Sequence, residues 1–103
     1  MRIGAACAGV MPPADSEHDY YRGCARFAGR HIPEAERAAA LKALHIDTVL
    51  ASLEREGRYD CTFHVREADG RLVRKEWTFL YLDKSRRNIV YTRRNAAQAA
   101  EPL

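Results

Sequence analysis

The sequence has few of the residues that mark specialised classes of protein. Its 103 residues include three cysteines, Cys7, Cys24 and Cys61, which are far apart and form no Cys-x-x-Cys pair. This number and spacing argue against a disulfide framework and a structural zinc site, and favour reduced thiols in a cytoplasmic protein. No run of about 18 apolar residues occurs, so no membrane-spanning segment is predicted. Residues 1–10 are too short and too weakly basic for a signal peptide.

Signatures of catalysis and metal binding are also missing. The four histidines have no metal-ligand spacing, no serine lies in a Gly-x-Ser-x-Gly context, and there is no glycine-rich phosphate loop. We therefore predict a protein that is not an enzyme and has no metal site, and the sequence identifies no cofactor. Two weaker alternatives are haem ligation through His18 or His31 and flavin binding near Cys24, whose surroundings match the photosensor cysteine motif poorly. A small apolar core residue is the preferred interpretation of Cys24.

The composition is that of an ordinary globular domain, with 47% hydrophobic and 30% charged residues. The length suits one small domain, which we place at residues 1–95, followed by an alanine-rich linker or tail at 96–103. The net charge of +3 is too small to indicate a class of partner.

The most informative stretch is residues 58–95, which predicts three antiparallel strands. Apolar and polar residues alternate from Tyr59 to Arg66, as expected for a strand with one buried face. Asp69-Gly70 indicates a turn, which we expect to be a three-residue loop over 68–70 with Gly70 left-handed. A long strand over 72–82 and a third over 88–93 follow, separated by the charged turn 84–87.

The segment before these strands predicts one strand and three helices. A strand is expected within residues 2–10, and a helix over 17–28 with Asp15 or Ser16 as its N-cap and Gly29 as its C-cap. That helix would bury Tyr20 or Tyr21 together with residues 24 and 27. A second helix begins at Pro33, and a third, over 48–55, is expected to have Asp47 as its N-cap and Gly57 at its end.

The alternation also assigns the two faces of the sheet. Trp77, Phe79 and Tyr81 share a face with the apolar residues of the first strand, and we expect the helices to cover it. Leu72, Leu80 and Leu82 fall on the opposite face. That face needs a second cover, which would be an N-terminal segment, another domain or a second subunit.

Together these segments resemble the PAS domains of bacterial signalling proteins, which are often found upstream of diguanylate cyclase or phosphodiesterase modules. The residues that carry the resemblance are Lys75 and the segments DYY at 19–21, IPEAER at 32–37, LEREGRY at 53–59, FHVREADGR at 63–71, TFLYLD at 78–83 and RRN at 93–95. The resemblance implies an α+β fold, a PAS-like antiparallel sheet with short helices on one face. One of the two usual N-terminal strands has no counterpart in the sequence.

The resemblance further implies a regulatory sensory or dimerisation domain in cytoplasmic signal transduction. Its expected partners are a second copy of the chain and an effector domain or signalling protein, with no membrane or nucleic acid. If a small ligand binds, its expected lining is Tyr20, Phe27, Leu41, Val49, Leu53, Cys61, Phe63, Trp77 and Phe79. The alternative is that these residues fill the core themselves.

Two rival functions remain open from the sequence. A nucleic-acid-binding module would need its basic side chains on one face; the candidates are Arg74, Arg86, Arg87, Arg93 and Arg94. A small α+β enzyme with a cone-shaped pocket would need a deep pocket containing His64 and Asp60, which are the nearest acid and base candidates.

Overall fold

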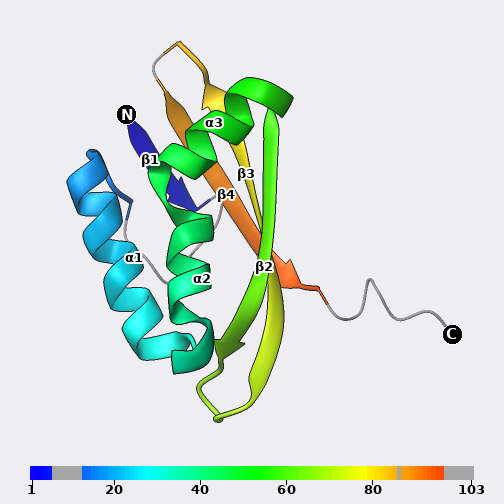
Figure 1. Ribbon diagram of the computed structural model, residues 1–103. Coiled ribbons are helices and arrows are strands. Elements are labelled where there is room, and N and C mark those ends of the chain that lie inside the picture. The colour runs from blue at the N-terminus through cyan, green and yellow to red at the C-terminus, as the bar shows by residue number, and fades with distance from the viewer. Residues whose placement is uncertain (6–12, 86, 97–103) are drawn as a thin grey trace, which may run out of the picture.

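The computed structural model describes residues 1–5, 13–85 and 87–96, and these form an α+β fold. The elements are β1 (Arg2–Ala5), α1 (Glu17–His31), α2 (Glu34–Leu44), α3 (Ile46–Glu56), β2 (Arg58–Arg66), β3 (Leu72–Asp83) and β4 (Asn88–Asn95). The three helices lie together on one side of the sheet (Figure 1). This confirms the predicted fold class. No helix in the described part of the chain is long and apolar enough to cross a membrane.

The sheet has the strand order β1-β4-β3-β2. β2, β3 and β4 are antiparallel neighbours, as expected, whereas β1 joins β4 in parallel and makes the sheet mixed. On the other edge of β1, Ile3 and Ala14 exchange two backbone hydrogen bonds of 2.9 Å. The sequence offered only one of the two usual N-terminal strands. In the described part of the chain, the Ile3–Ala14 pair is the one β-bridge on this edge of β1. The rest of the predicted first strand, residues 6–10, lies outside the described residues.

The β2–β3 hairpin has the predicted register. Cys61 lies opposite Trp77, so odd-numbered residues of both strands share a face. The turn closes with a 2.8 Å hydrogen bond from the Glu67 N–H to the Arg71 carbonyl, which leaves the expected three residues in the loop. Gly70 has φ of 89°, a left-handed conformation that glycine adopts without steric cost.

α1 begins where predicted but continues past its predicted end. The Ser16 hydroxyl accepts a 3.1 Å hydrogen bond from the Asp19 N–H, so Ser16 is the N-cap of the two candidates. Gly29 does not end the helix, which runs to His31. The reason is a distant side chain: Arg37 Nε donates to the carbonyls of Ala28 and Ile32, at 3.0 and 2.9 Å. The Ala28 carbonyl also accepts from the Ile32 N–H at 3.1 Å, so the guanidinium adds a second donor there and supplies one to the Ile32 carbonyl, which follows the helix.

The predicted starts of α2 and α3 both need correction. Pro33 is the N-cap of α2 and lies one residue before the helix. Asp47 is not the N-cap of α3, because His45 holds that position and its Nδ1 accepts a hydrogen bond from the Asp47 N–H at 3.2 Å. Asp47 instead lies in the first turn, where its carboxylate suits the positive end of the helix dipole. Gly57 ends α3 with φ of 75°, as predicted.

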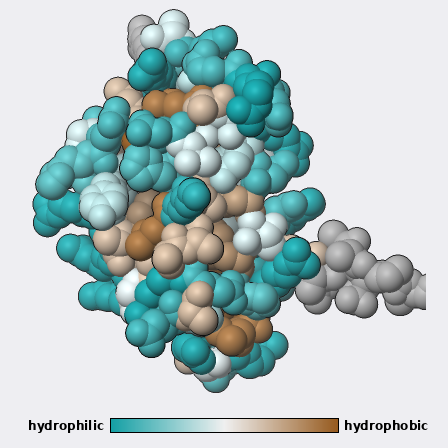
Figure 2. Space-filling model, in the orientation of Figure 1, coloured by the Kyte–Doolittle hydropathy of each residue, from teal (hydrophilic) through white to brown (hydrophobic). Residues whose placement is uncertain are grey.

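The helices cover the aromatic face of the sheet, as expected. Trp77 and Phe79 are completely buried in the same cluster as Tyr20 of α1 and Val49 of α3. Tyr20, rather than Tyr21, faces inward, because Tyr21 is 59% exposed. On the helix side, Figure 2 shows apolar residues in separate patches among hydrophilic ones.

The outer face of the sheet keeps exposed leucines. Leu82 is 76% exposed, and Leu72 and Leu80 are also exposed. We refer to these three leucines as the outer leucines. Charged side chains between them are paired within the face: Arg58 lies 2.9 Å from Asp60, and Arg94 lies 2.7 Å from Glu76. This face therefore combines apolar side chains with two neutralised charge pairs, and it also carries the exposed Arg74.

Candidate ligand-binding groove

A row of stacked aromatic rings forms the centre of the helix-covered face. The Trp77 ring lies 5.4 Å from that of Phe63, 5.2 Å from that of Tyr91 and 5.4 Å from that of Phe27, measured between centroids. Tyr91 contacts Phe79 at 5.5 Å, so the row crosses β2, β3 and β4. Contacts of this kind contribute about 0.5–1.5 kcal/mol per pair beyond the burial of area.

The structure brings the residues of the expected ligand lining into one cluster. The fully buried members are Tyr20, Phe27, Val49, Leu53, Phe63, Trp77 and Phe79. Leu41 and Cys61 are half-buried and pack against this cluster. The nine residues therefore share a core. Two of them also line surface pockets: Phe27 lines the groove described below, and Tyr20 lines a second pocket between the start of α1 and the start of α3.

Two polar atoms inside the aromatic row have no hydrogen-bond partner. Trp77 Nε1 and the Tyr91 hydroxyl are buried, and neither bonds to another atom of the described residues. Burying an unsatisfied donor costs about 1–3 kcal/mol, and such a group in a folded protein calls for an explanation. By contrast, the Tyr20 hydroxyl donates to the Leu44 carbonyl at 2.5 Å, and the Tyr59 hydroxyl donates to the Ala43 carbonyl at 2.8 Å.

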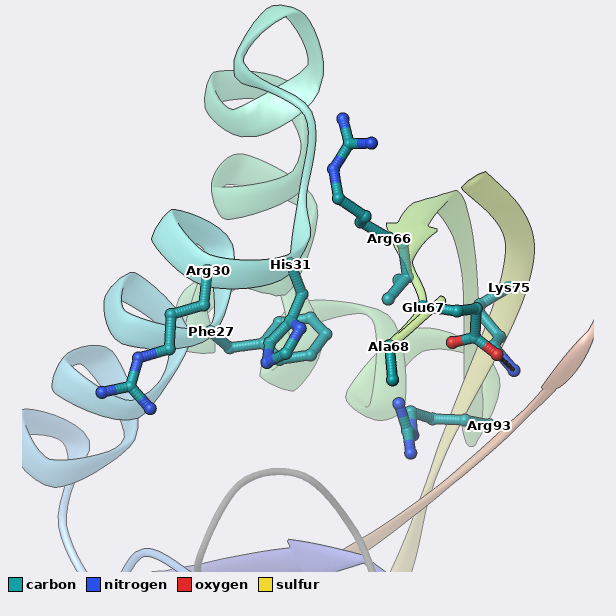
Figure 3. Close-up of a pocket in the computed structure, with 9 residues that line it drawn as sticks. Phe27, Arg30, His31, Arg66, Glu67, Ala68, Lys75 and Arg93 are labelled. Atoms are coloured by element: carbon teal, nitrogen blue, oxygen red, sulfur yellow. Dashed lines mark ion pairs between the residues drawn. The ribbon is translucent and has the colours of Figure 1, made fainter. Parts of the chain in front are cut away.

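An open groove of about 470 Å³ lies beside this row, between the C-terminal end of α1 and the β2–β3 hairpin (Figure 3). Its lining combines apolar, basic and acidic side chains: Phe27, Arg30, His31, Val65, Arg66, Glu67, Ala68, Lys75 and Arg93. The rings of Phe27 and His31 lie against each other, with 5.1 Å between centroids, and form one wall. Arg93 and Ala68 lie on the other side, whereas the side chains of Arg30 and Arg66 extend away from Arg93 in different directions (Figure 3).

The groove is connected to the aromatic row through Arg93. The guanidinium carbon of Arg93 lies 5.4 Å from the centroid of the Trp77 ring, a cation–π contact between facing residues of β3 and β4. Lys75, on the same face, donates to Asn95 Oδ1 at 2.7 Å and lies 3.8 Å from Glu67. A charged ligand in this groove would therefore act directly on the contact between Arg93 and the buried Trp77 ring.

Sequence reasoning missed most of this groove, although a signal was available. Lys75 and Arg93 have odd numbers, as do the inward-facing Trp77 and Tyr91, so both basic residues lie in the apolar register of their strands. A charged residue in an inward register at the end of a strand is a departure from simple alternation. The contribution of α1 could not be found this way, because it depends on how the helix packs on the sheet.

The arginines proposed for nucleic-acid binding do not share one face. Arg93 lies on the helix side, over Trp77, whereas Arg94 pairs with Glu76 on the outer face. Arg74 is exposed on that outer face, and Arg87 lies in the β3–β4 turn. Arg86 lies outside the described residues. The described arginines thus diverge from one another.

The acid and base candidates of the small-enzyme alternative are also separated. His64 Nδ1 lies 2.9 Å from Glu36 Oε2, beside the edge of β2. Asp60 accepts hydrogen bonds from Thr78 and Arg58; partial burial acts to raise the pKa of Asp60, but these two partners lower it overall. A carboxylate held ionised in this way is a poor general base near neutral pH.

Potential metal ligands do not gather in the described part of the chain. No group of three histidine, cysteine or acidic side chains there could hold a metal ion. Cys24 is buried, and burial raises its pKa to about 11, which favours an inert neutral thiol. Burial likewise raises the pKa of Cys61 to about 12. Cys7 lies outside the described residues.

Comparisons of the chain with protein-family models, with curated proteins and with solved structures gave no match. The likeness to PAS domains therefore depends on the segments quoted above and on an element order of one strand, three helices and three antiparallel strands.

Proposed function

We propose that the chain is a PAS-like regulatory domain of a bacterial, cytoplasmic signalling protein, which senses a small ligand at the edge of its aromatic core. The single observation that carries this proposal is the pair of buried, unpartnered polar atoms, Trp77 Nε1 and the Tyr91 hydroxyl, in a core whose residues Phe27 and Val65 also line a groove. A core that served only packing would gain stability by losing them.

A route for the signal follows from the position of β4. This strand carries Tyr91 and Arg93 on its inner face and runs to Asn95, after which the Ala96 N–H donates to the Arg74 carbonyl at 2.9 Å. A ligand that alters the packing of these side chains would bias the last strand and the segment that follows it. An effector domain or partner protein would receive this change.

Native mass spectrometry of gently purified protein tests ligand sensing. We expect part of the protein to carry a small molecule of constant mass. Trp77→Phe and Tyr91→Phe each remove one unpartnered polar group, and both are expected to reduce the bound fraction. Tyr59→Phe removes a hydroxyl that donates to the Ala43 carbonyl, and should leave the bound fraction unchanged. Bare protein, together with no stabilisation by any compound in a thermal-shift screen, would refute ligand sensing.

A second proposed role, dimerisation, is favoured by the outer leucines. The occupant we propose for this face is a second copy of the chain. Because Arg58 and Asp60 are paired within the face, as are Arg94 and Glu76, two copies packed about a two-fold axis would bury no unpaired charge from these four residues. Exposed apolar side chains of this kind mark interaction sites.

Sedimentation velocity over a range of protein concentrations tests the dimer. We expect the native chain to be dimeric and the double variant Leu80→Glu/Leu82→Glu to be monomeric, because four carboxylates would then be buried at the interface. Tyr21→Glu is the matched control, since it places a charge on an exposed apolar residue of α1 and should leave the dimer intact. A monomeric native chain, or a double variant that still dimerises, would rule out this interface.

A further inference from the structure

The charge of the groove indicates what kind of ligand it selects. Three of its basic residues, Arg30, Arg66 and Arg93, form no ion pair with a carboxylate in the described part of the chain. Arg66 donates to the Gly70 carbonyl at 3.2 Å, and Arg93 lies on the Trp77 ring. The only acidic lining residue, Glu67, is already beside Lys75. The groove therefore has an excess of positive charge that no carboxylate within it neutralises.

The walls of the groove add an apolar requirement. Phe27 is 3% exposed and supports the half-buried ring of His31, while Val65 lies on β2 close to the hairpin turn. A planar or aliphatic group would contact this wall, and a guanidinium opposite would bind a carboxylate or phosphate with two parallel hydrogen bonds. The two features lie within one groove and so favour a ligand that carries both.

We infer that the groove binds a small organic anion, whose acidic group is held by Arg93 and whose apolar body lies against Phe27 and His31. This inference rests on the proposed sensory function and names the chemical class of the ligand. Binding draws the Arg93 guanidinium toward the acidic group and changes its contact with Trp77. The ligand charge is thus transmitted to the aromatic row and to β4.

The test uses Trp77 as the reporter, because it is the only tryptophan in the chain. The probes are benzoate and phenyl phosphate, with benzamide as the neutral counterpart and inorganic phosphate as the anion without an apolar body. We expect benzoate or phenyl phosphate to change the Trp77 emission in a saturable manner, and benzamide and inorganic phosphate to bind at least about tenfold more weakly. The tighter of the two anions identifies the preferred acidic group.

Two variants locate the site. Arg93→Gln is expected to weaken binding of the tighter probe by at least about tenfold, measured by calorimetry so that the result does not depend on tryptophan emission. Arg26→Gln removes an equal charge from an exposed position of α1 outside the groove and should bind as the native chain does. An equal loss in both variants would overturn the assignment to the groove.

The outcomes separate this inference from the proposed function. If benzamide binds as tightly as benzoate, the ligand class is wrong although ligand sensing stands. If none of the four probes binds while native mass spectrometry still finds a retained molecule, the ligand class is likewise wrong. If no molecule is retained and no compound stabilises the protein, both the sensory function and the ligand class fail.

Discussion

Replacing Trp77 by alanine is expected to lower the free energy of unfolding by about 3–5 kcal/mol. The side chain is completely buried and lies at the centre of the aromatic row, in contact with rings on α1, β2 and β4. Its removal leaves a cavity that stacked, interlocked rings cannot close. Because a small domain has a total stability of about 5–15 kcal/mol, this one substitution removes a large share of it.

The effect is measured by urea unfolding followed with far-UV circular dichroism, since the variant has no tryptophan to report. Tyr21→Ala is the matched control: it shortens a side chain of α1 that is 59% exposed and outside the proposed dimer face, and it should change stability by less than about 0.5 kcal/mol. Trp77→Phe keeps a ring in place and should lower the free energy of unfolding clearly less than Trp77→Ala does. It gives a measurable value even if Trp77→Ala does not fold. A loss below about 1 kcal/mol for Trp77→Ala would contradict the role of the aromatic row.

The strands could be predicted from the sequence because their determinants are local. Alternation over 59–66 assigns each side chain to a face, and a three-residue loop ending in Gly70 then sets the register with Trp77. Burial of one face follows from the same parity. The α+β order and the leucine-bearing outer face were predictable for this reason.

The corrected helix boundaries depend on contacts that no local pattern contains. Gly29 is a reasonable C-cap from composition, but Arg37 reaches back from α2 to satisfy the carbonyls at the end of α1. Asp47 is likewise a good N-cap residue, yet the neighbouring His45 holds that position with its imidazole. In both cases another residue, Arg37 or His45, makes the hydrogen bonds at the helix end that were expected from Gly29 or Asp47.

The groove illustrates the same limit for function. Lys75 and Arg93 could be found from their parity, since they interrupt an apolar register. Phe27 was already expected to line a ligand, but His31 beside it was not, because its place in the groove depends on how α1 packs against the sheet. The chemistry of a site shared by a helix and a hairpin is thus visible only after the tertiary structure is formed.

Alkaline pH is expected to destabilise the domain strongly, because its buried thiol and phenol groups keep their protons only in the folded state. Burial raises the pKa of Cys24 from 9.0 to about 11 and the pKa of Tyr91 from 10.0 to about 12. Burial also raises the pKa of Tyr20 far above its ordinary value. In each case the folded chain keeps its proton at a pH where the unfolded chain has lost it. The stability from these groups is therefore complete below about pH 9 and is lost as pH rises through the folded pKa values.

The size of this loss is large for a domain of this length. A shift of one pKa unit between the unfolded and folded states corresponds to about 1.4 kcal/mol. Cys24 and Tyr91 therefore each account for about 2–3 kcal/mol of unfolding free energy that is lost once the pH exceeds their folded pKa values. Urea midpoints measured at steps from about pH 7 to pH 11 should be constant at first and then fall steeply. Cys24→Ala should flatten the first part of that fall, whereas Val49→Ala, which destabilises the core without removing a proton, should keep the native slope. A midpoint that stays constant to pH 11 would mean that these thiol and phenol groups are not held neutral by the core, and the helix-covered aromatic face would then be more hydrated than the structure has it.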